Sequence, residues 1–195
     1  MSSHSLAAEH YLPRTVDGEL DELFKGAAAI PLEGAKGVGK SATAAERATR
    51  TFLMEDPAVR EAVAAAPELL RGTGPVLIDE WQHLPMTWDV VRRAVDAGAA
   101  PGQFLLTGSA SSFSPGSHSG AGRILKVRMR PLSLAERGLS SPTVSLAAIL
   151  TGTQPDVSGE TSVGLPEYVD EICGSGFPGI RGLPQRVRRA QLRGY

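Results

Sequence analysis

The sequence of 195 residues predicts an α/β fold, with helices flanking a doubly wound and mostly parallel sheet. Short apolar runs alternate with helical patterns through the first 108 residues, which is typical of strands joined by crossover helices. The runs 76–78 and 104–106 are entirely apolar and are followed by polar residues. Such runs indicate parallel strands buried on both faces, with polar groups only at their carboxyl ends. Ligands of open α/β sheets bind at that edge.

The elements of this sheet follow in chain order. Residues 1–13 are polar and we expect them to be loose, after which Asp17 can cap a short helix over 18–25. An apolar run at 27–32 predicts the first strand, and a helix is expected over about 41–50. The next predicted elements are a strand at 51–54, a helix at 57–70 interrupted at Pro67, a turn at 72–75, a strand at 76–80, an amphipathic helix at 88–97 and a strand at 103–109.

The pattern becomes weaker after the strand at 103–109. Residues 110–122 are rich in serine, glycine and alanine, which predicts a mobile segment and a candidate lid. Residues 124–129 alternate apolar and basic side chains, as in a half-exposed strand. Beyond Leu139 we expect a linker at 151–165, a short helix at 166–172 and a tight turn at 174–179.

A glycine-rich loop lies between the first strand and the helix that follows it. Gly34, Gly39, Lys40 and Ser41 match the Walker A spacing G-x-x-x-x-G-K-[ST]. Glycine lets main-chain amides turn inward, and the following helix directs its unpaired N–H groups at the same anion. The pattern predicts a P-loop NTPase with a triphosphate cradle. Its predicted binding residues are Gly34, Ala35, Lys36, Gly37, Val38, Gly39, Lys40, Ser41 and Ala42.

Two acids end the strand at 76–80. Asp79 is the expected second anchor for Mg²⁺, acting through the water shell of the metal while Ser41 binds it directly. Because the backbone turns at a strand end, Glu80 can face a water in line with the γ-phosphate, as its base or orienter. The alternative is a pair of solvated acids at a strand terminus.

Three further residues are candidates for the same chemistry. Thr107 or Ser109 could hydrogen-bond the γ-phosphate or the attacking water, or could simply cap the turn. Arg123 could neutralise transition-state charge in its own or a neighbouring subunit, or could be a surface arginine that begins a strand.

The end of the chain is basic. This region could contact nucleic acid, although such runs are commonly one face of a solvated helix, and no aromatic residues interleave here. The arginines concerned are Arg181, Arg186, Arg188, Arg189 and Arg193.

Composition limits the function classes. The net charge of −1 gives no global reason to expect nucleic acid or an anionic membrane as a partner. No run approaches 18 apolar residues, and residues 1–14 do not resemble a signal peptide, so we expect a cytoplasmic protein without membrane contact. The one cysteine, Cys173, excludes an internal disulfide and is expected to be a buried small hydrophobe. Four scattered histidines suggest no metal beyond the Mg²⁺ that accompanies the nucleotide.

Taken together, these motifs resemble prokaryotic AAA-fold ATPases of the additional-strand catalytic-glutamate type that carry a C-terminal domain of unknown function. The resemblance extends over nearly the whole chain. It rests on residues 11–14 (Tyr-Leu-Pro-Arg), 32–41, 77–82 (Leu-Ile-Asp-Glu-Trp-Gln), 105–109 (Leu-Leu-Thr-Gly-Ser), 121–124 and 130–136.

The resemblance implies an AAA/RecA-like core in which the Thr107 strand separates the Asp79 strand from the phosphate-loop strand. It also implies ATP as the nucleotide, Glu80 as the catalytic acid, Thr107 as the first sensor and Arg123 as a nucleotide-sensing arginine. By this reading residues 1–139 form the AAA-type ATP-binding core. Residues 140–195 are a linker and the incomplete start of a C-terminal region, since in the family this segment leads into a further domain and the chain looks truncated.

The function expected from these features is ATP binding with slow Mg²⁺-dependent hydrolysis, coupled to motion of a partner domain. A homo-oligomer or a partner protein could supply that domain. The alternatives are a non-catalytic nucleotide switch or interaction module, a small-molecule kinase, and a DNA-associated motor. The kinase is disfavoured because the Asp79-Glu80 pair suits activation of water.

Overall fold

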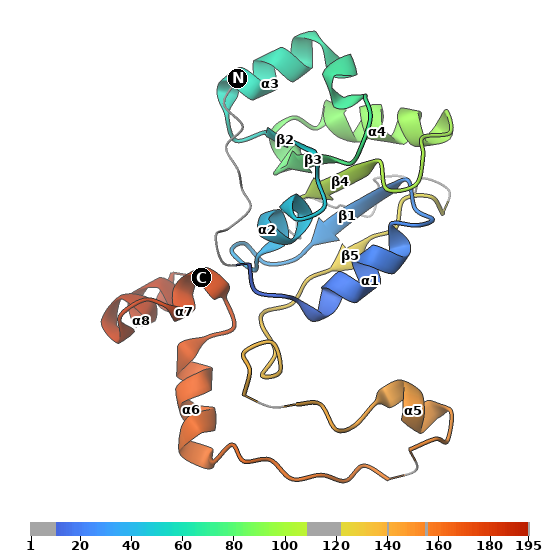
Figure 1. Ribbon diagram of the computed structural model, residues 1–195. Helices are drawn as coiled ribbons and strands as arrows, with labels where there is room; N and C mark the ends of the chain where they lie inside the picture. Colours follow the sequence, from blue (N-terminus) through green and yellow to red (C-terminus); the bar gives the residue numbers. More distant parts are fainter. Residues whose placement is uncertain (1–10, 109–121, 140, 155, 195) are drawn as a thin grey trace. The chain divides into compact units, whose positions relative to one another are not determined.

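A computed structural model describes residues 11–108, 122–139, 141–154 and 156–194. The chain divides into two compact units, Met1–Arg130 and Pro131–Tyr195 (Figure 1). The first unit contains the sheet and all of the predicted site residues, whereas the second is built from short helices and extended segments.

The first unit is organised around a parallel sheet. Within its described residues the sheet has five strands in the order β2-β3-β4-β1-β5, so β4 lies between the Asp79 strand and the phosphate-loop strand, as predicted (Figure 1). The doubly wound α/β fold is therefore confirmed. The strands are β1 Ala29–Glu33, β2 Arg50–Leu53, β3 Val76–Asp79, β4 Phe104–Thr107 and β5 Val127–Arg128.

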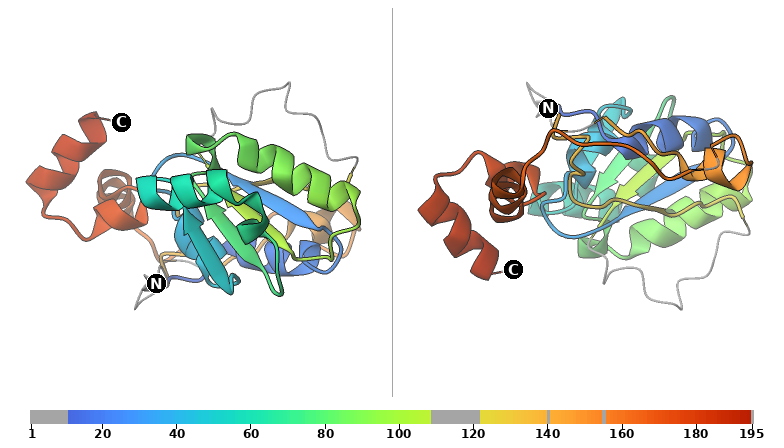
Figure 2. Two further views of the ribbon diagram at one scale, coloured as in Figure 1. Left: turned by 90° about the horizontal axis from the view of Figure 1, so that it is seen from above. Right: turned by 90° about the horizontal axis from the view of Figure 1, so that it is seen from below.

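Helices cover both faces of the sheet (Figure 2). The chain moves outward from β1 to β2 through α2 and returns through β3 to β4 by way of α3 and α4. Because crossover connections are right-handed, opposite directions of travel place the helices on opposite faces. The helices of the first unit are α1 Thr15–Leu23, α2 Lys40–Ala45, α3 Pro57–Ala65 and α4 Met86–Asp96, with 3₁₀ turns η1 Pro67–Leu70 and η2 Trp81–His83.

Strand alternation decides which side chains reach the site. Ile78 and Leu106 belong to a buried cluster that includes Trp88 and other residues of α4 on one face of the sheet. Successive side chains of a strand point to opposite faces, so the next residues, Asp79 and Thr107, point away from that cluster. Ser41 of α2 bonds Asp79, and Thr107 bonds the same carboxylate, so both residues lie on the α2 side of the sheet.

Several element boundaries differ from the predicted ones. Helix α1 begins at Thr15 because the Arg14 amide donates to the Asp17 carboxylate at 2.6 Å, which places Asp17 inside the first turn. Helix α2 ends at Ala45, and Thr49 then bonds the Pro75 carbonyl to start the pairing of β2. Strand β5 has two residues, although Ile124 also bridges Ala29. Residues 110–121 of the predicted lid lie outside the described residues.

The second unit contains α5 Leu146–Leu150, α6 Leu165–Gly174, α7 Pro178–Arg181 and α8 Gln185–Arg193. Helix α6 extends the predicted helix at 166–172, whereas α5 was not predicted and α7 begins within the predicted turn. Four of the five arginines at the basic end lie on α8, and the fifth ends α7. Cys173 is partly exposed rather than buried, which corrects the prediction. Among the described residues, no helix combines the length and apolar character needed to cross a membrane.

A partly buried ion cluster links three segments of the second unit. Glu171 of α6 accepts hydrogen bonds from Arg137 at 2.8 Å and from Arg181 at 2.7 and 3.0 Å. The Glu171 side chain is 17% exposed. The hydrogen bonds from Arg181, followed by those from Arg137, lower the pKa of Glu171 to about 2 against the cost of burial. The carboxylate therefore joins α6, α7 and the segment after Pro131.

This cluster predicts a pH-dependent stability. Because the folded pKa of Glu171 is depressed, its contribution is fully present above about pH 4.5 and is lost as the pH falls towards 2. At pH 7 we expect Glu171→Gln to lower the free energy of unfolding by about 1.5–3 kcal/mol, as for hydrogen bonds to a charged group. Denaturation followed by circular dichroism from pH 7 to pH 3 should show the difference shrinking with acidity. Glu22→Gln, in an exposed pair with Lys25, is the control; an equal loss in both variants would contradict the prediction.

Candidate functional site

The glycine loop follows β1 and enters α2 at Lys40. Gly37 and Gly39 have φ of 76° and 106°, in the region that side chains with a Cβ avoid. A Cβ at Gly34 would lie 2.6 Å from the Met129 carbonyl oxygen. Backbone turns and one close backbone contact therefore account for the glycines of the motif.

The start of α2 is open to an anion. Gly39 is the N-cap residue and makes no side-chain capping hydrogen bond. The first N–H groups of a helix have no intrahelical partner, and the positive end of the helix dipole lies at the same place. The loop and the first turn of α2 can therefore donate main-chain hydrogen bonds to phosphate oxygens.

Lys40 is buried at the base of the loop. Its side chain is 4% exposed, and Nζ donates to the carbonyl oxygens of Gly34 at 3.1 Å and Ala35 at 3.0 Å. Burial lowers the pKa of Lys40, although the carboxylates of Glu80 and Asp79 raise it in opposition. The ammonium group is held by the loop whose phosphate site it is predicted to serve.

Asp79 lies at the meeting point of three elements. Ser41 of α2 donates its hydroxyl to Asp79 Oδ1 at 2.6 Å, and Thr107 of β4 donates to the same oxygen. The strand register explains this contact. Ile78 pairs with Leu106 and Leu32 pairs with Thr107, so the carboxyl ends of β3, β4 and β1 lie side by side. Asp79 is 9% exposed and Thr107 is fully buried. Residues from two separate sequence motifs thus form one hydrogen-bonded cluster.

Glu80 leaves the strand with an unusual backbone. Its φ of 49° and ψ of 50° are left-handed, a conformation uncommon in residues other than glycine and frequent at functional sites. The Glu80 amide donates to Thr107 Oγ1 at 3.2 Å, and its carboxylate accepts a hydrogen bond from the Gln82 amide nitrogen. The sequence motifs alone assign no role to Gln82. Its position two residues after the acid, within the turn η2, is the signal that could have found it.

Arg123 lies away from the phosphate loop. Its guanidinium contacts Asp96, the last residue of α4, at 3.1 Å, and the next residue, Ile124, bridges Ala29 at the start of β1. The phosphate loop begins beyond the other end of β1, roughly 13 Å away at the rise of a strand. The structure therefore does not bring Arg123 to the cradle of its own chain. Ser109 lies outside the described residues.

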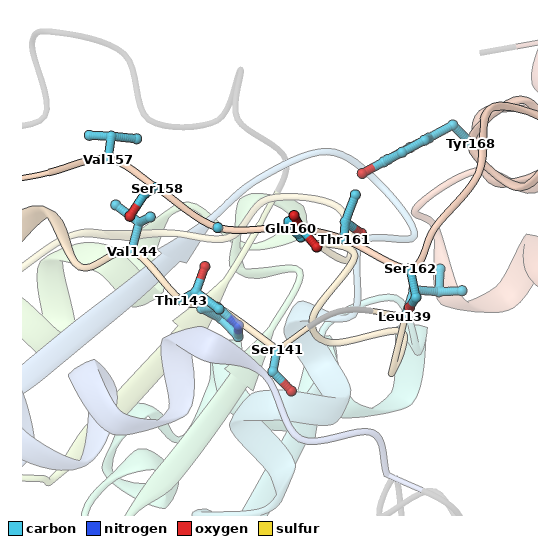
Figure 3. Close-up of a pocket in the computed structure, with 12 residues that line it drawn as sticks. Leu139, Ser141, Thr143, Val144, Val157, Ser158, Glu160, Thr161, Ser162 and Tyr168 are labelled. Carbon is cyan, nitrogen blue, oxygen red and sulfur yellow. The ribbon is translucent and has the colours of Figure 1, made fainter.

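A cavity of about 620 Å³ lies within the second unit (Figure 3). Two extended segments, 141–144 and 157–162, line it together with Leu139 and Tyr168. None of the predicted site residues contributes to its walls. Its lining carries a single ionisable acid, Glu160, and no basic side chain, so it lacks the groups that a phosphate site needs.

The sequence model of the family described as AAA domain matches residues 27–137. This match covers more than half of the chain and includes the glycine loop, Asp79, Glu80 and Thr107. The chain belongs to the AAA domain family. A nucleotide-binding function of the ATPase type follows from that membership. No curated protein matches the sequence with significant similarity.

Three solved structures are similar to parts of this AAA domain protein. A RuvB variant from Thermotoga maritima aligns with 68% of this chain and 51% of its own, at 18% identity and a TM-score of 0.42. A Signal Transduction ATPase with Numerous Domains from Pyrococcus horikoshii has a tetratricopeptide repeat sensor. The alignment covers 70% of this chain and 26% of that protein, at 12% identity and a TM-score of 0.43. The alignment with PCH-2 from C. elegans covers 89% of this chain and 58% of PCH-2, at 15% identity and a TM-score of 0.37. The chain thus spans about half the length of the RuvB structure, and family membership rests on the sequence match.

The contact between Gly34 and Met129 predicts the effect of a single methyl group. In Gly34→Ala the new Cβ would overlap the Met129 carbonyl, which is backbone and cannot rotate away. We expect the AAA domain to lose about 1–3 kcal/mol of unfolding free energy. Gly18→Ala in α1, where a Cβ meets nothing within 4 Å, should instead gain about 0.5–1 kcal/mol. Urea denaturation of both variants checks this, and parent stability in Gly34→Ala would contradict it.

Proposed function

We propose that this AAA domain binds ATP with Mg²⁺, hydrolyses the γ-phosphate slowly, and passes the resulting conformational change to a partner domain or partner protein. The observation that carries the proposal is the 2.6 Å hydrogen bond between Ser41 and Asp79. The hydroxyl that follows the phosphate-loop lysine and the acid at the end of β3 are 38 residues apart in sequence. Their contact gathers the groups that magnesium-dependent phosphoryl transfer requires.

The donor set at this position fits Mg²⁺. The metal prefers hard oxygen ligands and in nucleotide sites keeps several waters, taking one or two protein oxygens and the phosphates. Ser41 Oγ and an Asp79 carboxylate oxygen are such ligands, and Ser41 would bind directly while Asp79 would act through water. When bound, Mg²⁺ would neutralise charge on the β- and γ-phosphates.

The protein groups then divide the work. The loop amides at 34–42 and the Lys40 ammonium would hold the phosphates by charge-assisted hydrogen bonds. Glu80 would accept a proton from the attacking water. The oxygen of that water would bond the γ-phosphorus while the bond from the γ-phosphorus to the β–γ bridging oxygen breaks. Thr107 contacts both the Asp79 carboxylate and the Glu80 amide, so it would fix the two acids relative to each other.

Two features favour a slow reaction. The Glu80 carboxylate is engaged by Gln82, so this hydrogen bond must be released or shared before the acid can take a proton. Arg123 is paired with Asp96, away from the loop, which leaves a charge-stabilising arginine to a neighbouring subunit or partner. Such an arginine is worth about 10³ to 10⁵ in rate.

Removal of the loop lysine tests nucleotide binding. In Lys40→Ala the ammonium is lost, and we expect the Kd for MgATP to rise roughly 10- to 100-fold, the equivalent of a charged hydrogen bond. Isothermal titration calorimetry measures the constant. Lys25→Ala removes an exposed lysine that pairs with Glu22 outside the loop, and it should leave the Kd at the parent value. An unchanged Kd in Lys40→Ala would refute the cradle.

Replacement of the second acid tests hydrolysis separately. Glu80→Gln keeps the shape of the side chain but removes its basicity, so we expect unchanged ATP affinity and a phosphate-release rate lower by a factor of about 10² or more. Glu46→Gln, at the exposed end of α2, serves as the matched control and should turn over like the parent. Equal rates for Glu80→Gln and the parent would remove Glu80 from the mechanism.

A second candidate is a nucleotide switch that binds ATP without hydrolysing it. The hydrogen bond from Gln82 favours it, because this bond occupies one oxygen of the Glu80 carboxylate that would otherwise be available to the attacking water. Phosphate release measured under saturating MgATP distinguishes the two functions. Binding with no turnover in the parent would favour the switch.

A further inference from the structure

We propose that Arg14 is a positioning residue of the phosphate loop, tying the loop to the end of the sheet through one guanidinium group. The proposal rests on the proposed function, because it concerns how the same triphosphate site is shaped. Arg14 is 7% exposed and precedes α1, outside both of the motifs that form the site.

The guanidinium joins two backbone carbonyls that are far apart in sequence. Nη1 donates to the Val38 carbonyl at 2.8 Å, and Nη2 donates to the Arg130 carbonyl at 2.7 Å. Arginine presents its N–H donors in a rigid planar fork, so the two bonds fix the two carbonyls relative to each other. Lysine has no such fork and cannot reproduce this geometry.

The Val38 carbonyl is a sensitive place to hold the loop. It belongs to the same planar peptide unit as the Gly39 N–H, and in a trans peptide the two groups point in opposite directions. This peptide unit turns about ψ of Val38 and φ of Gly39, and Gly39, whose φ is 106°, lacks the Cβ that would restrict the turn. A hydrogen bond to the Val38 oxygen therefore sets the direction of the Gly39 amide, one of the predicted phosphate donors.

The second carbonyl provides the fixed point. Arg130 follows Met129, whose amide donates to Glu33 at the end of β1 at 2.7 Å. The loop is thus anchored to the strand end from which it departs. Arg130 is also the last residue of the first unit, and its carbonyl belongs to the peptide bond with Pro131.

Arg14 is itself held in place from α1 and α2. Its amide donates to the Asp17 carboxylate at 2.6 Å, and Asp17 is also bonded by Tyr11 and by Arg47. The Tyr11 hydroxyl lies 3.0 Å from Thr43 Oγ1 on α2. The segment before α1 therefore contacts both the loop and the helix that follows it, and Arg14 is its contact with the loop.

The experiment uses the full chain and two ligands, MgATP and magnesium tripolyphosphate. Tripolyphosphate has no base or sugar, so its affinity reports on the phosphate loop alone. In Arg14→Met we expect the Kd for each of the two ligands to rise about tenfold. Arg14→Lys keeps the charge but can reach one carbonyl, and its affinities should lie between those of the parent and Arg14→Met.

The matched control is Arg50→Met. Arg50 also donates to two carbonyls, Leu69 at 3.1 Å and Arg71 at 2.8 Å, but at the start of β2. It should leave both affinities at the parent value. Parent affinity for tripolyphosphate in Arg14→Met would overturn the proposal, as would a loss confined to ATP.

Two further comparisons separate a failure of this proposal from misfolding of Arg14→Met and from a failure of the proposed function. If Arg14→Met does not fold, Arg14→Lys decides, since parent affinity for tripolyphosphate in that variant overturns the proposal. If Lys40→Ala also binds ATP like the parent, the proposed function fails. If only the Arg14 variants retain parent affinity, the cradle stands and the positioning role alone is wrong.

Discussion

The structure of the site depends on one buried carboxylate. Asp79 receives the hydroxyl hydrogens of Ser41 and Thr107, so a helix start and two neighbouring strand ends are fixed around a single oxygen. A carboxylate taken out of water is costly unless such donors replace its hydration. The same requirement that stabilises the fold therefore keeps these groups together at the edge where parallel sheets bind ligands.

The cluster could be predicted from sequence to a considerable extent. Strand alternation predicts the direction of the Asp79 side chain, and the glycine-loop spacing predicts that of Ser41. The buried apolar runs predict the order of the strands and helices along the chain. The position of β4 between β1 and β3 came from the family resemblance and is confirmed by the pairing. Strand ends are predictable because burial leaves polar residues only there.

Other features depend on contacts that local patterns do not encode. The left-handed turn at Glu80 and the hydrogen bond from Gln82 arise where the chain leaves the sheet, and the sequence does not specify the turn. Arg123 was assigned to the site by its neighbours in the chain, but β5 pairs in a register that places it at the other end of β1. Arg14 was part of the resemblance without a role, because its two carbonyl partners are 24 and 116 residues away. Helices α5 and α7 have only five and four residues, which is too short for a helical period to show in the sequence.

The outer strands of the sheet carry a consequence for the behaviour of the protein at high concentration. Strand β5 spans two residues and β2 spans four, and the arginine at the start of β2 lies 5.9 Å from the ring of Phe52. Unpaired strand edges act as templates for intermolecular pairing, and short or charged edges are poor templates. Within the described residues, this sheet therefore gives a second molecule little backbone to extend, which disfavours association through its strand edges.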